Sequence, residues 1–198
     1  DHRDLHVRSR RQRQMCIRDS DYGAEIWAET IEQIRIQAPE CTIEVLTPDF
    51  RNYASAFEKV FKAEPDIFSH NIECVERISR QVRPQSDWNR SLSVLQASIE
   101  WGLNTKTGMM VGLGENDSEV LETMQEIAEL GISIFNIGQY LQPTLNHLPV
   151  QRFVHPDIFT MYKERGLEMG FRVVESGPLV RSSYHADEQA RQLSDIYN

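Results

Sequence analysis

Five adjacent side chains near the C-terminus can hydrogen-bond or bind a metal: Arg181, Ser182, Ser183, Tyr184 and His185. They follow a Gly-Pro pair at 177–178, which predicts a turn after the apolar run before it. Neither serine stands in a G-x-S-x-G sequence, so a hydrolase nucleophile has no local support. Residue types alone do not distinguish a polar surface loop from a ligand-binding loop here.

A second polar group, His70, Asn71 and Glu73, follows a short apolar run. A histidine beside a carboxylate can carry out acid–base chemistry. Alternatively, Asn71 caps a helix and His70 is a hydrogen-bonded core residue. The sequence leaves both interpretations open.

The turn Gly112-Leu113-Gly114-Glu115 could hold a phosphate on its amides at a helix N-terminus. It lacks both nucleotide-binding glycine patterns, which favours a purely geometric role for the glycines. Lys106 could form a Schiff base if it were desolvated. Its position at the start of a predicted strand favours a structural or solvated lysine instead.

Histidines at 147, 155 and 185, with Asp157 and Asp187, raise the possibility of zinc, but no H-x-x-x-H or C-x-x-C spacing supports it. His155 precedes a proline and an aspartate, which is typical of a helix start. The three cysteines, at 16, 41 and 74, are widely separated and odd in number. They predict free thiols in a reducing compartment, and they cannot by themselves hold a metal cluster.

Length and composition predict one globular domain: 198 residues, 40% hydrophobic and 26% charged. The longest apolar runs are far too short for a membrane span. The net charge of -9 disfavours nucleic acid and anionic lipid as partners. We therefore expect a cytoplasmic protein.

The first twenty residues contain six arginines and no apolar periodicity, whereas a patterned helix begins directly after them. We expect residues 1–20 to be a foreign or disordered arm, with roughly residues 5–20 resembling translated vector sequence. Residues 21–198 then form the folded domain.

After this arm, helical and strand patterns alternate. Apolar spacing and breakers predict helices and strands in turn. The predicted helices cover 24–36, 53–63, 72–82, 86–102, 117–131 and 155–170, and the predicted strands cover 42–47, 66–71, 106–114, 133–141 and 171–176. Asn116 and Glu119 have capping-box spacing, and Pro156 and Gly170 bracket the last helix.

Five strands separated by helices predict a parallel sheet built of right-handed crossovers. The sheet is either an open doubly wound sheet or part of a (β/α) barrel. In both, ligands bind at the C-terminal ends of the strands. We therefore expect the site among residues 47–49, 70–73, 112–115 and 138–142 and from Ser176 onward.

From about Asp21 to its end, the chain resembles the lipoyl synthases, a family of radical S-adenosylmethionine enzymes. The matching runs are EVLTPDF (44–50), HNIECV (70–75), RPQSDWNRSL (83–92), KTGMMVGLGE (106–115), GQYLQPTLNHLPVQRFVHPDIF (138–159) and GPLVRSSYHADEQA (177–190). The last two runs are the most specific. The resemblance implies a partial (β/α) barrel of the radical S-adenosylmethionine type, truncated at its N-terminus.

The resemblance also implies a reaction. Two [4Fe-4S] clusters and S-adenosylmethionine act on an octanoyl chain carried by a lipoyl domain, and sulfur is inserted at C6 and C8. The implied partners are octanoylated 2-oxoacid dehydrogenase E2 subunits and glycine cleavage H protein, with ferredoxin or flavodoxin as electron donor. Ser183, or with less support Ser182, is the implied oxygen ligand of the second cluster. Asn71, Lys106, Gly112, Glu115, Gln139 and Arg181 are the implied cofactor-binding residues.

One family feature is missing: the sequence has no C-x-x-x-C-x-x-C motif, and Cys41 and Cys74 match no ligand position of the family. We therefore expect this chain alone to bind no cluster, to be inactive, and to expose an apolar edge. Two alternatives are a cluster-free module that binds octanoylated or lipoylated carrier domains, and a Schiff-base (β/α) lyase that uses Lys106 and His70.

Overall fold

The computed structural model describes residues 21–183 and 188–189; the predicted foreign arm at 1–20, Tyr184 and His185 lie outside the described residues. Five parallel strands form one sheet: β1 (Glu44–Leu46), β2 (Ile67–Ser69), β3 (Thr105–Val111), β4 (Ile134–Gln139) and β5 (Val173–Gly177). The helices are α2 (Ala24–Gln37), η1 (Phe50–Asn52), α3 (Ala54–Lys62), α4 (Glu76–Val82), α5 (Trp88–Glu100), α6 (Asp117–Glu129) and α7 (Pro156–Met169). The predicted alternation of helices and strands is confirmed.

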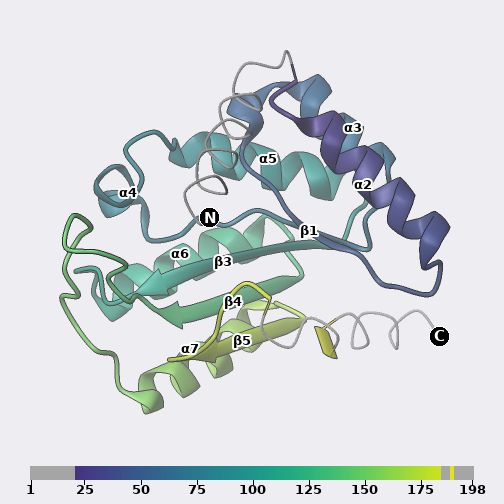
Figure 1. The fold of residues 1–198 in the computed structure, drawn as a ribbon. Helices are drawn as coiled ribbons and strands as arrows, with labels where there is room; N and C mark the ends of the chain where they lie inside the picture. Colours follow the sequence, from purple (N-terminus) through teal and green to yellow (C-terminus); the bar gives the residue numbers. More distant parts are fainter. Residues whose placement is uncertain (1–20, 184–187, 190–198) are drawn as a thin grey trace, which may run out of the picture.

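The strand order decides between the two predicted architectures. The strands lie side by side in chain order, β1-β2-β3-β4-β5. A doubly wound sheet needs a reversal of this order, and none occurs in the described part of the chain. Consecutive right-handed crossovers place the helices on one face, as in a (β/α) barrel. Figure 1 shows the loop after β5 (residues 178–183), here called the last loop, crossing the opposite face. The fold is therefore an open, partial barrel.

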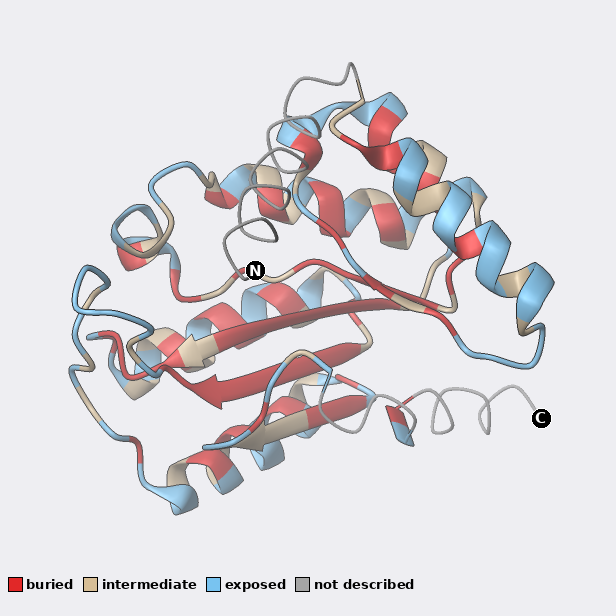
Figure 2. Cartoon of the chain, viewed as in Figure 1, coloured by how far each residue is buried: buried red, intermediate tan, exposed pale blue. Residues whose placement is uncertain are grey.

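The main core lies between the sheet and its helices. Strands β3 and β4 are buried almost throughout (Figure 2). Phe135 and Ile137 of β4 pack with Val120, Met124 and other apolar residues of the covering helices. Because strand side chains alternate, the residues between them point to the inner face of the barrel.

Local signals set the ends of two helices. The Asn116 side chain accepts a hydrogen bond from the amide of Glu119, and Glu119 reaches back to the amide of Asn116, which completes the predicted capping box. Helix α7 begins at Pro156 and ends at Gly170, whose φ of 106° is in the left-handed region.

One helix prediction is wrong at its start. Helix α4 begins at Glu76, not near residue 72, and its N-cap is Val75, so Asn71 caps no helix. The segment instead continues alongside β3: the amide of Glu73 donates to Gly108, and the amide of Met110 donates to Glu73. This backbone pairing overrides the local helical pattern.

Of the two roles that the sequence left open for His70, the structure shows the hydrogen-bonded core residue. It is 1% exposed, and its ring nitrogens lie 2.8 Å from the main-chain oxygen of Thr47 and 3.0 Å from the hydroxyl of Ser91. Burial lowers the pKa of the imidazole.

Among the described residues, no helix is long and apolar enough to cross a bilayer.

Candidate functional site

A cavity of about 170 Å³, here called the inner-face cavity, lies on the sheet face that the helices leave uncovered. Its floor consists of the inward-facing positions of β3 and β4: Gly108, Met110, Asn136 and Gly138. Gly108 is opposite Asn136 and Met110 is opposite Gly138 in the strand register. Two glycines in strand interiors leave room for a ligand to approach the backbone.

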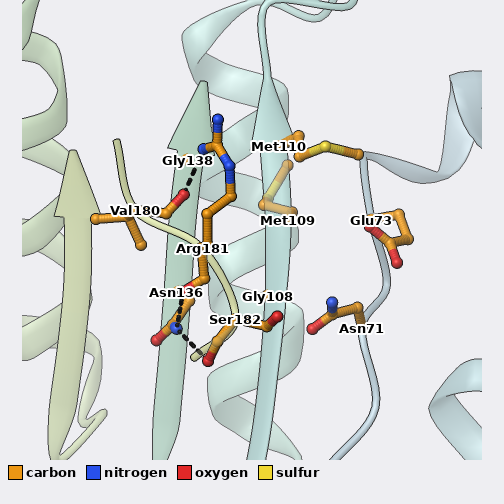
Figure 3. A pocket seen from close by; sticks show the side chains of 10 residues that line it. All are labelled: Asn71, Glu73, Gly108, Met109, Met110, Asn136, Gly138, Val180, Arg181 and Ser182. Carbon is orange, nitrogen blue, oxygen red and sulfur yellow. Dashed lines mark hydrogen bonds between the residues drawn. The ribbon is translucent and has the colours of Figure 1, made fainter. Parts of the chain in front are cut away.

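The loop after β5 forms one wall of this cavity. The side-chain amide of Asn136 lies 3.2 and 3.3 Å from the main-chain oxygens of Arg181 and Ser182 and donates to them (Figure 3). The Arg181 guanidinium donates to the oxygen of Val180 at 2.6 Å. The predicted binding loop therefore folds back over β4.

The opposite wall comes from the segment after β2. Asn71 and Glu73 line the cavity there (Figure 3). Burial raises the pKa of the Glu73 carboxyl, and the guanidinium of Arg83 and the amide of Asn71 oppose this rise. Glu73 itself has a φ of 71°, in the left-handed region. Backbone outliers of this kind are common at functional sites.

Asn136, on the floor of the inner-face cavity, has an unsatisfied side-chain oxygen. Its Oδ1 atom is buried and accepts no hydrogen bond from any described residue. A buried carbonyl oxygen without a donor is destabilising by about 1–3 kcal/mol unless a ligand or water satisfies it. Glu73 adds a carboxyl group to the lining of the inner-face cavity, so the cavity fits a ligand that donates hydrogen bonds.

Lys106 lies outside this cavity, at the start of β3 as predicted. Its side chain is 1% exposed, and its ammonium group is 2.9 and 3.0 Å from the two carboxylate oxygens of Glu44 on β1. It also donates to the side-chain oxygen of Gln189 at 2.8 Å. Burial lowers the pKa of Lys106, and Glu44 counteracts this. The lysine thus links the barrel interior to the C-terminal segment.

Glu115 and Gly112 form a closed turn after β3. The Glu115 carboxylate is 6% exposed and accepts hydrogen bonds from the amides of Gly112 at 2.6 Å and Leu113 at 2.9 Å. Gly112 has a φ of 101°, and a β-carbon there would lie 2.3 Å from the main-chain oxygen of Arg152. The left-handed conformation and the close contact with Arg152 explain why residue 112 is a glycine.

Gln139 joins this turn to a distant segment. Its side-chain amide donates to the oxygens of Val111 at 3.2 Å and Arg152 at 3.0 Å, and its carbonyl oxygen accepts from the amide of Val154 at 2.9 Å. These bonds hold residues 151–154 against the end of β3.

Of the six predicted cofactor-binding residues, two line the inner-face cavity, Asn71 and Arg181.

The two serines of the last loop differ in position. Ser182 is half-buried and lines the inner-face cavity, whereas Ser183 is exposed. A metal ligand set is not visible around them: within residues 21–183 and 188–189, no three His, Cys, Asp or Glu side chains are arranged to hold a metal ion. His185 and Asp187, two members of the considered zinc group, lie outside the described residues.

Sequence reasoning missed Asn136 and Gly108 as site residues, whereas Gly138 lies within the predicted range 138–142 and lines the inner-face cavity. An asparagine in the middle of the buried run SIFNIGQYL was the available signal, because an interior strand seldom places an amide without a partner. Glycines inside two neighbouring strands were a second signal.

Comparison with known proteins agrees with this architecture. The family model described as the radical SAM superfamily matches residues 17–127. The crystal structure of methylornithine synthase (PylB) superposes with a TM-score of 0.54 at 11% identity, over 89% of this chain and 64% of that one. At this identity the likeness concerns the fold alone.

Curated relatives are much more similar in sequence. Lipoyl synthase from Rubrobacter xylanophilus is 54% identical over 171 residues, which are 85% of this chain and 53% of that protein. Lipoyl synthase from Bacteroides fragilis is 50% identical over 171 residues, 86% of this chain and 59% of that protein. The chain therefore spans somewhat more than half the length of these relatives.

Proposed function

Because the chain belongs to the radical SAM superfamily, we propose that it provides the substrate-enclosing part of a lipoyl synthase. The observation that carries this proposal is the identity of about half of all aligned positions with lipoyl synthases, across most of the chain. The proposed reaction inserts two sulfur atoms, at C6 and C8 of the octanoyl chain on a lipoyl carrier protein.

The proposed partners follow from this reaction. The octanoyl chain is attached to a lysine of a 2-oxoacid dehydrogenase E2 subunit or of glycine cleavage H protein, and ferredoxin or flavodoxin supplies electrons. When bound, S-adenosylmethionine supplies the group that removes hydrogen from the octanoyl chain, and an iron–sulfur cluster supplies the sulfur. The remaining work, done by this chain, is to bind and orient these groups and to exclude water.

The inner-face cavity fits part of S-adenosylmethionine. Glu73 supplies an acceptor carboxyl group to its lining, and the ammonium and ribose hydroxyl groups of this cofactor are donors. Asn71 and Arg181 would complete the wall around it. At about 170 Å³ the cavity is smaller than the pockets that enclose whole ligands of this size. We propose that it receives one end of the cofactor.

The described residues do not provide the ligands of an iron–sulfur cluster. Such clusters are held mainly by cysteine thiolates. Cys74 is buried in the core and Cys41 is exposed, and the sequence contains no C-x-x-x-C-x-x-C motif. Ser183 is exposed on the last loop, so its oxygen is available to a cluster held by other groups. We propose Ser183 as that single ligand, and we expect the 198 residues alone to have no synthase activity.

A chimeric protein tests the proposal. Residues 21–198 would replace the matching part of Rubrobacter xylanophilus lipoyl synthase, and the gene would be expressed in a bacterium that lacks its own lipoyl synthase. We expect growth without added lipoate. Failure of a well-expressed, soluble chimera to support growth, while the parent enzyme does, would count against the proposed function.

A further inference from the structure

A second cavity, here called the arginine cavity, lies beyond the C-terminal end of β1. It has a volume of about 630 Å³, and three of its lining residues are arginines: Arg51, Arg83 and Arg90. Asp49 is the single carboxylate among its lining residues. Counting also Glu73, which pairs with Arg83 from outside the lining, three guanidinium groups face two carboxylates, so the cavity has a net positive charge in a chain whose net charge is -9.

Two of the arginines are held in place. The Nε atom of Arg90 donates to Asp49 at 3.0 Å, and its Nη2 atom donates to the main-chain oxygen of Gln85 at 3.0 Å. The Nη1 atom of Arg83 lies 3.5 Å from a carboxylate oxygen of Glu73. Each guanidinium has five N–H donors, so both retain donors for a ligand.

Arg51 is presented by a strained turn. The three residues of η1, Phe50, Arg51 and Asn52, have φ values of 41°, 51° and 60°, and such consecutive left-handed residues are unfavourable outside glycine. Burial of Phe50, which is 1% exposed, and a 3.0 Å hydrogen bond from the Arg51 amide to Asp49 hold this turn. The turn therefore fixes Arg51 at the surface.

The Arg51 side chain is available for an anion. Its guanidinium carbon lies 5.7 Å from the centroid of the Tyr22 ring, a cation–π contact that orients the group. Within the described part of the chain, this guanidinium makes no hydrogen bond and no ion pair. A planar, oriented guanidinium binds carboxylates through two parallel hydrogen bonds.

We propose that the arginine cavity binds an acidic segment of the protein that carries the octanoyl chain; the identity of this partner rests on the proposed function. The cavity is large enough for several side chains, and the net negative charge of the chain disfavours a nucleic acid. Glu73 pairs with Arg83 on one side and lines the inner-face cavity on the other. A partner docked on the arginines would therefore lie beside the inner-face cavity.

Titration calorimetry on the full chain tests the proposal with two probes: an octanoylated lipoyl carrier domain, and acetylated hexaglutamate. The variant Arg51→Gln removes one charge and no internal hydrogen bond. The control Arg165→Gln removes the same charge from α7, where Arg165 forms an exposed ion pair with Glu168. We expect Arg51→Gln to weaken the binding of both probes about tenfold, a typical effect of losing one charge-assisted pair. We expect Arg165→Gln to leave both affinities unchanged.

The outcomes separate this proposal from the proposed function. Carrier binding that is the same in the wild type, Arg51→Gln and Arg90→Gln would contradict the proposed role of the arginine cavity. It would leave the proposed function unaffected. No carrier binding, with hexaglutamate binding that depends on Arg51, would support an acidic-segment site and contradict the proposed partner. Tighter binding of inorganic pyrophosphate than of hexaglutamate, lost in Arg51→Gln, would identify a phosphate site and overturn the proposal.

Discussion

A β-carbon at Gly138 would lie 2.3 Å from the main-chain oxygen of Val180. Real β-carbons essentially never lie this close to a neighbouring atom. The last loop can therefore lie against β4 only because residue 138 is glycine. The contact explains how the loop comes to line the inner-face cavity.

The variant Gly138→Ala should displace this loop. The added methyl group has no space, and overpacking of this kind costs about 1–3 kcal/mol. Because the displaced loop loses its hydrogen bonds to Asn136, we expect trypsin to cleave after Arg181 faster than in the wild type. The matched control is Gly177→Ala, where the nearest atom is a Val180 methyl at 3.4 Å. Equal cleavage rates in the two variants would contradict this account of the loop.

The variant Lys106→Met should destabilise the fold strongly. It leaves Glu44 without its ion-pair partner, and loss of one member of a buried ion pair costs about 3–5 kcal/mol. Urea unfolding measures this change. Lys59→Met is the control, because Lys59 pairs with Asp21 and Glu25 at the surface, where such pairs contribute about 0–1 kcal/mol. A similar small loss in both variants would show that the Lys106 pair is not a buried anchor.

The two described cysteines should differ in reactivity. Burial raises the pKa of the Cys74 thiol to about 12, so very little thiolate is present at neutral pH. Cys41 is exposed. We expect iodoacetamide to modify Cys41 in the folded protein and to modify Cys74 only after unfolding, as mass spectrometry of tryptic peptides would report. Rapid modification of Cys74 in the folded chain would contradict its burial in the core.

His70 should make stability fall in mild acid. Its folded-state pKa lies below the ordinary value of 6.5, so below about pH 6.5 the unfolded chain binds a proton that the folded chain does not. The stability contributed by neutral His70 is therefore present above that pH and decreases as the pH falls. We expect urea unfolding at several pH values to show a smaller decrease in His70→Gln than in the wild type. An equal decrease in His70→Gln and in the wild type would contradict this role of His70.

Local patterns were sufficient for much of the fold. The capping box at Asn116 and the Pro156–Gly170 bracket depend on residues three to fourteen positions apart, and both were predictable. The start of α4 was not, because Glu73 pairs with β3, more than thirty residues away. Long-range pairing of this kind leaves no periodicity in a single segment.

The candidate site was only partly predictable for the same reason. The rule that ligands bind beyond strand ends led to Asn71 and Arg181, which do line the inner-face cavity. It did not lead to Asn136, because the last loop turns back over the middle of β4. The arginine cavity combines residues 49–51 with residues 83–90, which no motif spacing connects.

The most direct test of the central claim is the mass of an octanoylated carrier domain after incubation with the purified, anaerobically reconstituted chimera, S-adenosylmethionine and a reductant. If residues 21–198 form the substrate-enclosing part of a lipoyl synthase, the carrier gains the mass of two sulfur atoms, because each C–H bond at C6 and C8 becomes C–S–H and the reductant keeps the product as the dithiol. Ser183→Ala in the chimera should abolish this change. An unchanged carrier mass, with the parent enzyme active under the same conditions, would contradict the account.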